Sequence, residues 1–466
     1  MIAPVERLPL QPDLAVALRT RFGARFTTAP AICLNHGKDE SSHPAMPPDA
    51  VIFAESTDDV AEAVRLCHAH LTPVIAYGTG TSLEGHLLAV QGGVCIDLSA
   101  LNRIIAVRPE DLDATVQCGV TRKTLNAEIN REGLFFPIDP GADASLGGMA
   151  ATRASGTNAV RYGTMRENVL AATVVLADGR IIKTGSRAKK SSSGYDLTRL
   201  FVGSEGTLGI ITELTVRLYP IPEAISSAVC AFPSIAEAVA TVIRTIQLGV
   251  PVARIELLDT LALQAINRYS KTSLTEAPTL FFEFHGSPGG VEEQAQIVQE
   301  IAADHRGMGF DWATRPEDRS RLWQARHDAL YACLGLKPGA RALTTDVCVP
   351  ISQLAECIAA TIIDLETVGL PAPVVGHVGD GNFHMVVLAD PENADEIARA
   401  HDFAARLARR AIAMDGTCTG EHGIGLGKQK YLALEHGEAA VDVMRAIKNA
   451  LDPRNIMNPG KIMPPA

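Results

Sequence analysis

Two stretches of the chain gather the residue types of an open metal site. One reads G-H-V-G-D-G-N-F-H and carries His377 and His384, and a later one reads G-T-C-T-G-E-H-G-I-G and carries Glu421 and His422. Two imidazoles and a carboxylate can hold a divalent ion with positions left for a substrate, and a further histidine beside them can act as a base. The sequence lacks the helical H-E-x-x-H zinc motif. We therefore predict an enzyme with a metal site at His377, His384 and Glu421 and with His422 as its base.

The spacing of the two histidines predicts a hairpin. His377 and His384 are seven residues apart, with Gly379, Asp380 and Gly381 between them and an apolar run after the second histidine. This pattern indicates a strand end, a tight turn and a strand start, so both rings can project from neighbouring positions. A lone histidine is usually a surface or core residue, and the chain has 13. Titratable groups gathered in glycine-rich loops favour function, because glycine is costly to order.

The composition indicates a large enzyme that does not bind nucleic acid. The chain has 466 residues and a net charge of -11, and its only short basic run is Arg187 with Lys189 and Lys190. DNA and RNA are therefore poor candidates as partners. The nine cysteines form no C-x-x-C pair, so we expect buried, reduced thiols and a cytoplasmic protein, which allows peripheral attachment at the inner face of a membrane. Residues 1–10 lack a long apolar stretch, so we expect neither a signal peptide nor a transmembrane segment.

The periodicity of apolar residues predicts an α+β fold with more than one domain. A helix capped at Thr57-Asp58 precedes a strand from Val74, and Thr121 caps a second helix over 121–132. After Tyr219-Pro220-Ile221-Pro222 the chain alternates strands with long amphipathic helices, as expected for an antiparallel sheet covered by helices. The predicted strands of this part are 228–232, 280–284, 374–378 and 384–388, and the predicted helices are 235–248, 291–305, 352–367 and 394–414, with another at 438–451.

Three glycine-rich segments, at 78–82, 140–163 and 203–211, suggest an extended ligand. The first is Gly78-Thr79-Gly80-Thr81-Ser82, which follows a strand, so its backbone N–H groups could surround a pyrophosphate. It is no Rossmann fingerprint, because Leu83 takes the place of the last glycine. Alone, such a loop is as often an ordinary turn as a ligand site. Several close approaches of the backbone indicate a long ligand.

With these motifs in order, the chain resembles the FAD-linked oxidases of the vanillyl-alcohol oxidase type, in the branch of D-lactate, glycolate and D-2-hydroxyglutarate dehydrogenases. The resemblance spans about 50–461 and rests on G-T-G-T-S, on D-P-G-A-D-A-S-L-G-G-M-A-A with A-S-G-T-N-A-V-R-Y-G, on G-S-E-G-T-L-G-I-I-T, and on the two metal-site stretches and N-P-G-K. W-Q-A-R-H-D-A at 323–329 and T-T-D-V-C-V-P-I-S at 344–352 are most similar to the cytochrome-linked D-lactate dehydrogenases of this branch.

The resemblance implies a domain plan and a set of FAD-binding residues. It implies a PCMH-type FAD-binding domain of two α+β subdomains at 1–222, an α+β cap domain with an antiparallel sheet at 223–416, and a segment at 417–466 that returns to complete the active site. The residues that match FAD positions of the family are Gly78, Thr79, Gly80, Thr81, Ser82, Pro140, Gly141, Gly147, Gly148, Ser155, Gly156, Ala159, Gly163, Glu205, Gly206, Thr207, Gly209, Ile211 and Asn458.

The resemblance also implies how the flavin and the substrate are held. Members that attach FAD covalently carry a histidine in the first loop, where this chain has Thr79 and Thr81, so we expect noncovalent FAD, with His86 as the one histidine just past the loop. Arg326 matches the arginine that binds the substrate carboxylate, against the plain alternative of a solvated helix charge. FAD accepts the C2 hydride at N5. A divalent ion such as Zn or Mn binds the substrate through His377, His384 and Glu421, and His422 takes the hydroxyl proton.

The expected activity is oxidation of a D-2-hydroxy acid, with D-lactate preferred and D-2-hydroxyglutarate or glycolate as alternatives. A metal-dependent hydrolase would explain the histidines but not the glycine segments. A flavin enzyme without redox chemistry would explain the glycine segments but not the histidines. The resemblance implies an electron acceptor such as cytochrome c, a quinone or electron-transfer flavoprotein, and is compatible with a homodimer.

Overall fold

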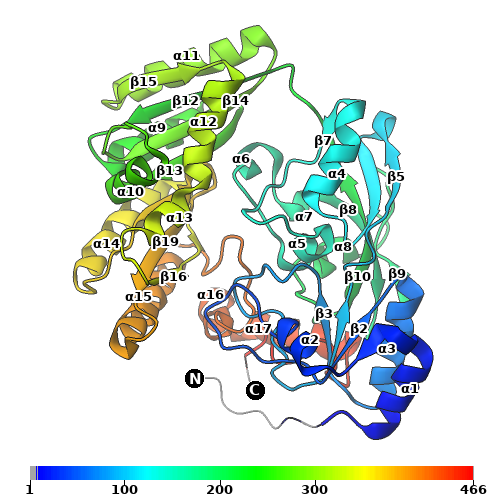
Figure 1. Cartoon of the computed structure of the whole chain (residues 1–466). Helices are drawn as coiled ribbons and strands as arrows, with labels where there is room; N and C mark the ends of the chain where they lie inside the picture. The colour runs from blue at the N-terminus through cyan, green and yellow to red at the C-terminus, as the bar shows by residue number, and fades with distance from the viewer. Residues whose placement is uncertain (1–6, 8, 465–466) are drawn as a thin grey trace. The chain divides into compact units, whose positions relative to one another are not determined.

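The computed structural model describes residues 7 and 9–464. The chain divides into two compact units (Figure 1). Unit 1 consists of the described residues up to Ser155, of 163–221 and of the chain from Glu421 onward, and unit 2 consists of 156–162 and 222–420. The prediction that no signal peptide is present concerns residues 1–10, most of which lie outside the described residues.

Unit 1 contains two main sheets. The four-stranded sheet has the order β1-β2-β4-β3, in which β2 and β3 run parallel to β4. The five-stranded sheet, β5-β6-β10-β8-β9, is antiparallel throughout. The strands are β1 Phe26–Thr27, β2 Ala50–Phe53, β3 Val74–Tyr77, β4 Val94–Asp97, β5 Ile104–Arg108, β6 Asp113–Gln117, β8 Val169–Val175, β9 Ile181–Lys183 and β10 Ile210–Arg217.

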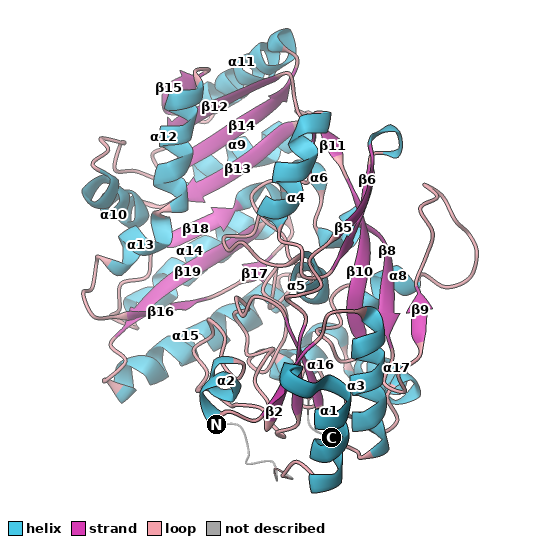
Figure 2. Cartoon of the chain, turned by 45° about the vertical axis from the view of Figure 1, so that its right-hand side comes forward, coloured by secondary structure: helices cyan, strands magenta, loops and turns pink. Residues whose placement is uncertain are grey.

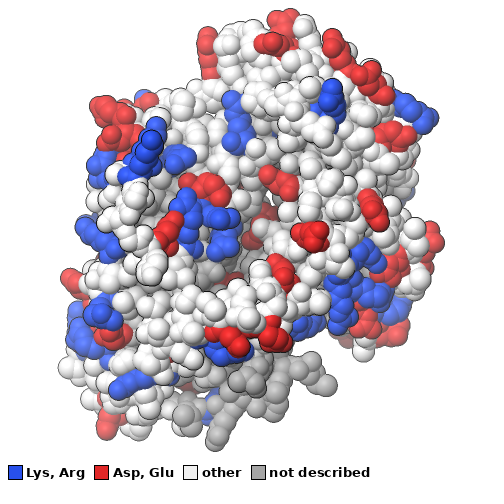
Figure 3. Space-filling view, turned by 180° about the vertical axis from the view of Figure 1, so that it is seen from behind, with Lys and Arg blue, Asp and Glu red and all other residues white. Residues whose placement is uncertain are grey.

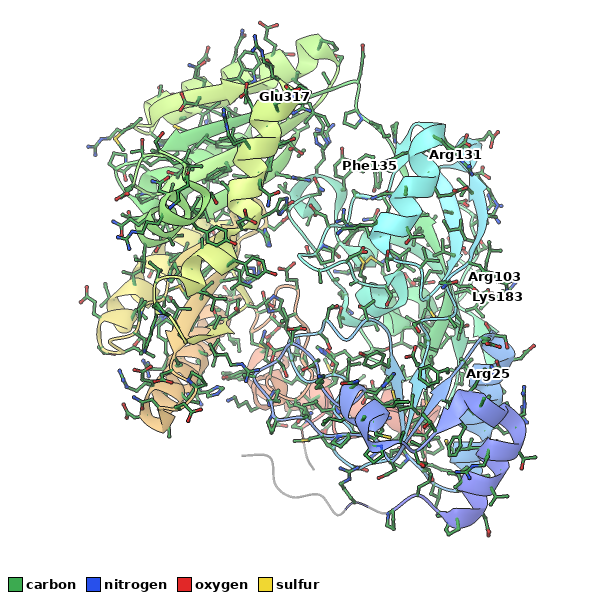
Figure 4. The ribbon with its side chains drawn as sticks, viewed as in Figure 1. Arg25, Arg103, Arg131, Phe135, Lys183 and Glu317 are labelled. Carbon is green, nitrogen blue, oxygen red and sulfur yellow. The ribbon has the colours of Figure 1, made fainter. Side chains whose placement is uncertain are left out.

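Short elements and helices complete unit 1. Strand β7 (Leu134–Phe135) pairs with β11 (Tyr219–Pro220), so Phe135, labelled in Figure 4, lies opposite Tyr219. The helices are α1 Pro12–Phe22, α2 Pro30–Asn35, α3 Thr57–Ala69, α4 Arg122–Ile129, α5 Leu146–Thr152, α7 Met165–Asn168, α8 Leu197–Phe201, α16 Leu432–His436 and α17 Glu438–Leu451.

Two helix caps in unit 1 test the sequence prediction directly. Thr121 is the N-cap of α4, and its side chain accepts a hydrogen bond from the backbone N–H of Thr124, as predicted. Helix α3 instead begins one residue earlier than its predicted cap: Ser56 is the N-cap and accepts from the N–H of Asp59. Serine, threonine and aspartate are all good N-caps, so three of them in a row leave the choice to the tertiary structure.

Unit 2 is built on one antiparallel sheet, with strand order β15-β12-β14-β13-β18-β19-β16 and with β17 also paired to β19 (Figure 2). Its strands are β12 Ala224–Ala231, β13 Val252–Leu258, β14 Thr279–Gly286, β15 Met308–Ala313, β16 Arg341–Thr344, β17 Val347–Cys348, β18 Val374–His377 and β19 Asn382–Ala389. Its helices are α6 Ala159–Tyr162, α9 Ile235–Gln247, α10 Thr260–Ser270, α11 Pro288–Asp304, α12 Pro316–His327, α13 Ala329–Leu334, α14 Leu354–Glu366 and α15 Ala394–Ala413.

Both faces of this sheet are covered, because side chains alternate along each strand. Phe282 and Leu257 belong to the core with α9, α11, α14 and α15, whereas Phe281 and Leu258 belong to the core with α10, α12 and α13. The predicted α+β class, with an antiparallel sheet covered by helices, is confirmed.

The cysteines and the charged surface agree with the sequence analysis. All nine cysteines are free thiols, and eight are buried. Burial raises the pKa of Cys67 to about 12. On the face seen in Figure 3, Lys and Arg side chains are interspersed with Asp and Glu, so this face carries no continuous basic stripe. Within the described residues, every helix is too short or too polar to cross a bilayer.

Candidate active site

The first glycine loop, residues 78–82, offers backbone donors to an anion. It follows β3, and Gly80 has a φ of +75°. A Cβ at this position would lie 2.6 Å from the hydroxyl oxygen of Tyr77, so the turn requires glycine. Within the described part of the chain, none of the backbone N–H groups of 78–82 donates a hydrogen bond. A run of donors of this kind suits a pyrophosphate, so the loop fits the dinucleotide part of FAD.

Ser145 brings the second glycine segment beside this loop. A Cβ on Gly78 would lie 2.6 Å from Ser145 Oγ, and the same oxygen accepts a hydrogen bond from the N–H of Gly148 at 3.4 Å. Gly147 serves packing, because a Cβ there would lie 2.5 Å from the Cβ of Cys118. Gly141 has open space around it instead. The segment therefore combines glycines that pack against the core with one that leaves room for a ligand.

The rest of the second segment is shared between the two units. Pro140, Ser155 and Gly163 belong to unit 1, whereas Gly156 and Ala159 belong to the short piece 156–162 of unit 2. Within unit 2, that piece is fastened by Asn158, whose Oδ1 accepts a hydrogen bond from Arg254 Nε at 3.0 Å.

The third segment holds a loop of its own unit through a buried carboxylate. Oε1 of Glu205 accepts from the N–H of Ile424 at 2.7 Å, and its Oε2 accepts from the N–H of Gly425 at 2.9 Å. His86 Nε2 lies 3.3 Å from the same carboxylate. Burial alone would raise the pKa of Glu205, but the charge of His86 and the two N–H donors lower it further than burial raises it. Glu205 thus fixes the loop that carries Glu421 and His422.

The other residues of the third segment mostly contact the protein. Gly206 has a φ of +73°, and the Thr207 hydroxyl donates to the carbonyl of Ser204 at 2.7 Å. Gly209 packs under Val174, and Ile211 lies in the core of the five-stranded sheet. Asn458 connects the segments, because its Nδ2 donates to the carbonyls of Glu205 and His86 at 2.8 and 3.1 Å. The carbonyl of Val74 in β3 accepts from the N–H of Asn458, so this C-terminal residue also joins the strand that leads into the first loop.

His377 and His384 lie on the predicted hairpin of unit 2. Strands β18 and β19 are antiparallel with Val375 opposite His384, and Gly381 turns between them with a φ of +78°. A Cβ on Gly381 would lie 2.1 Å from the carbonyl oxygen of Val349. The two rings are 5.4 Å apart between centroids and nearly perpendicular, at 82°.

Each histidine is held through its Nδ1 atom. His377 Nδ1 lies 2.7 Å from Oε1 of Glu256, and His384 Nδ1 lies 2.9 Å from the carbonyl oxygen of Thr345. Because both partners are acceptors, each neutral ring carries its proton on Nδ1 and its lone pair on Nε2. A nitrogen of one ring lies within 4.8 Å of a nitrogen of the other. This arrangement fits two imidazole ligands of one divalent ion.

Glu421 and His422 follow directly on Gly420, the last residue of unit 2. Asp346 fixes the end of that stretch, because its carboxylate accepts from Thr419 Oγ1 at 2.7 Å and from Asn382 Nδ2 at 2.8 Å. One peptide bond joins Gly420 to Glu421, so the Cα atoms of these two residues are about 3.8 Å apart. In unit 1, Glu421 Oε1 is 3.9 Å from His422 Nε2.

Arg326 is buried on α12, where its Nη2 donates to Oε2 of Glu256. It is only 9% exposed, and within the described residues its Nε has no hydrogen-bond partner. The plain alternative of a solvated helix charge is therefore wrong, whereas binding of a substrate carboxylate stays a prediction.

Glu256 is the residue that sequence reasoning missed. It is fully buried on β13 and contacts both His377 and Arg326. Burial alone would raise the pKa of Glu256, but its contacts with His377 and Arg326 lower it overall. Its one signal in the sequence is a carboxylate inside the stretch Val252–Leu258, which is otherwise apolar except for Arg254.

Comparison with known proteins identifies both halves of the chain. The family described as FAD linked oxidases, C-terminal domain, matches residues 221–462, and the FAD binding domain matches residues 48–185. A probable mitochondrial D-lactate dehydrogenase of Danio rerio is 55% identical over 93% of this chain and 88% of that protein. A mitochondrial D-lactate dehydrogenase [cytochrome] of Arabidopsis thaliana is 49% identical over 97% of this chain and 80% of that protein.

Among solved structures, p-cresol methylhydroxylase with substrate bound has a TM-score of 0.79 at 19% identity, covering 97% of this chain and 96% of that one. This likeness concerns the fold and confirms the predicted PCMH-type architecture. The match to the FAD binding domain confirms the prediction that the chain binds FAD. The predicted cytoplasmic location is wrong, because the two relatives above are mitochondrial proteins by name. That prediction rested mainly on free, buried cysteines. Burial of the thiols in the core accounts for their being free in any compartment.

Proposed function

Because the chain belongs to the FAD-linked oxidases, we propose that it oxidises a D-2-hydroxy acid, with D-lactate preferred, to the 2-oxo acid. The observation that carries the proposal is the pair His377 and His384, whose tautomers both leave the Nε2 lone pair for a metal, in a chain that binds FAD. The names of the relatives support D-lactate as the substrate. D-2-Hydroxyglutarate and glycolate are the alternatives within the same chemistry.

We assign the domains and the FAD contacts as the resemblance implies. The FAD-binding part is 1–222, the cap is 223–416, and 417–466 completes the active site. The donors of 78–82, the position of Ser145 beside Gly78 and the open space at Gly141 support the FAD assignment. Glu205 and Asn458 act chiefly by holding the protein around that site.

The substrate must lose a hydroxyl proton and a C2 hydride. When bound, FAD supplies a two-electron acceptor for the hydride, and a divalent ion supplies a Lewis acid that lowers the pKa of the substrate hydroxyl. His377, His384 and Glu421 are the residues that would hold the ion, which we expect to be Zn or Mn. His422 accepts the hydroxyl proton, and Arg326 binds the substrate carboxylate through its buried guanidinium. An acceptor such as cytochrome c, a quinone or electron-transfer flavoprotein then takes the electrons.

The preference for D-lactate does not rest on the apolar stretch after His384. Met385 and Val387 are fully buried in the core of unit 2, so they cannot select the substrate directly. Thr345 is also buried and is engaged with His384 and with the N–H of Met385. A distal carboxylate would still need a cation, because an unpaired charge is costly to desolvate.

FAD should be bound noncovalently. Thr79 and Thr81 occupy the first loop, and the nearby His86 is buried against Glu205, which holds its ring away from a role as an attachment point. Acid precipitation should leave the flavin in the supernatant. Flavin fluorescence that stays with the denatured polypeptide would contradict this expectation and point to His86.

Reduction of the flavin by a 2-hydroxy acid without oxygen tests the proposed function. A metal-dependent hydrolase would hold no flavin to reduce, and a flavin enzyme without redox chemistry would stay oxidised. Reduction by such an acid therefore excludes both alternatives, whereas its absence overturns the proposal.

A further inference from the structure

Glu256 contacts both His377, a proposed metal ligand, and Arg326, the proposed partner of the substrate carboxylate. One carboxylate oxygen accepts from His377 Nδ1 at 2.7 Å, and the other accepts from Arg326 Nη2. The side chain is fully buried on β13, in the middle of the sheet. Resting on the proposed function, we propose that Glu256 is a positioning residue: it fixes the tautomer and orientation of His377 toward the metal and holds Arg326 toward the substrate carboxylate.

The sheet register fixes the first of these contacts. Strands β13 and β18 pair with Leu257 opposite Gly376, and the same antiparallel register continues Glu256 toward His377. A cross-strand pair on a central strand is held by two backbones and does not depend on a flexible loop. The acceptor for His377 Nδ1 therefore lies on a central strand of the sheet. Carboxylates that bind a metal-ligating histidine in this way raise its basicity and orient its ring.

The second contact comes from the helical layer. Side chains alternate along β13, so Glu256 lies on the same face as Leu258, where α12 packs. Arg326 belongs to α12, and its Nη2 donates to the carboxylate of Glu256 from that layer. One buried group thus sets the positions of two residues that are far apart in the sequence.

A purely structural ion pair is the alternative, and the same sheet offers one for comparison. Glu283 on the adjacent strand β14 is also buried, and its carboxylate accepts from His285 Nε2 at 2.9 Å and lies 3.4 Å from Arg254 Nε. His285, however, uses its other nitrogen on Tyr162, with 2.8 Å between Nδ1 and the hydroxyl. Both nitrogens of His285 therefore have protein partners. A buried ion pair that only stabilises the fold could be replaced by apolar packing at little cost.

The test measures metal affinity separately from turnover. Mn²⁺ is titrated into the FAD-loaded protein, and the electron paramagnetic resonance signal of unbound Mn²⁺ gives the dissociation constant. In Glu256→Gln, an NH2 donor replaces one of the two carboxylate oxygens, so either His377 or Arg326 loses the atom that accepts its hydrogen bond. We expect Mn²⁺ to bind about 10 to 100-fold more weakly, which is the usual loss for such a partner of a ligand. FAD content should not change.

Glu283→Gln is the matched control, because it neutralises another buried carboxylate with an arginine and a histidine partner. It should keep the Mn²⁺ affinity of the unaltered protein. Saturating Mn²⁺ should restore a large part of the lost turnover in Glu256→Gln. The KM for D-lactate should stay raised, because the contact between residue 256 and Arg326 is still weakened. A merely structural role would predict no such rescue by metal.

The outcomes separate this inference from the proposed function. If the unaltered protein binds Mn²⁺ and Glu256→Gln binds it equally well, Glu256 is not a positioning residue, but the metal site stands. If Glu283→Gln weakens Mn²⁺ binding as much, general loosening of the sheet explains the effect and the inference is overturned. If the unaltered protein binds no metal, both the metal site and the inference are wrong. Should Glu256→Gln not fold, Glu256→Asp, which keeps both acceptors on a shorter side chain, must weaken Mn²⁺ binding for the inference to hold.

Discussion

Replacement of His422 by asparagine is expected to slow the reduction of FAD by D-lactate about 10² to 10⁴-fold, the usual contribution of a positioned general base. Asparagine keeps a polar side chain of similar reach but cannot take up a proton near neutral pH. The variant should retain its FAD and its metal. The rate of flavin reduction after rapid anaerobic mixing with D-lactate measures the effect on the chemical step itself.

The structure gives a reason to expect that this loss is local. The loop after His422 is pinned by Glu205, which accepts from the N–H groups of Ile424 and Gly425, and neither bond involves the His422 side chain. His436→Asn is a suitable control, because that histidine lies in the same unit at the end of α16. The control should reduce FAD at the normal rate. Loss of metal from His422→Asn would show that His422 is a ligand and not the base.

Removal of the metal should abolish turnover and leave FAD in place. The proposed ligands His377 and His384 belong to unit 2, whereas the first FAD loop, 78–82, belongs to unit 1. Dialysis against a chelator, or His384→Ala, should therefore remove activity without releasing flavin. Loss of one ligand or its partner reduces affinity or rate on the order of 10 to 100-fold or more.

The measurement combines elemental analysis, flavin absorbance and turnover on one preparation. His305→Ala changes a histidine of the same unit that follows α11, and it should keep both metal and activity. Added Zn²⁺ or Mn²⁺ should restore the chelated protein but not His384→Ala. Full turnover by protein that holds only traces of metal would rule out the metal site.

The part of the site that could be predicted from the sequence is the part encoded locally. Gly379, Asp380 and Gly381 indicated a tight turn between two strands, and the register of β18 and β19 confirms it. Gly381 adopts the left-handed conformation that a tight turn demands. Local signals of this kind need no knowledge of the rest of the fold.

The partners of these residues could not be predicted in the same way. Glu256 lies 121 residues before His377, and a single carboxylate in an apolar strand forms no motif. The partners of Glu205 could not be predicted for a similar reason: its carboxylate accepts hydrogen bonds from a loop 219 and 220 residues away. Contacts at such separations depend on the tertiary structure, which sequence periodicity does not encode.

Met385 and Val387 show how closeness in sequence differs from closeness to the site. They follow His384 closely in sequence, but alternation along β19 turns them into the helix-covered core, away from the site. A strand residue next to a ligand in sequence points to the other face of the sheet.

The most direct test of the account is anaerobic mixing of the purified, FAD-loaded protein with D-lactate, L-lactate and D-2-hydroxyglutarate in turn. We expect D-lactate to bleach the flavin absorbance rapidly, L-lactate not to bleach it, and D-2-hydroxyglutarate to act at least about tenfold more slowly. A preference of about tenfold or more for the dicarboxylate, about 1.4 kcal/mol in transition-state binding, would overturn D-lactate as the substrate. A flavin that stays oxidised with every 2-hydroxy acid would contradict the proposed function as a whole.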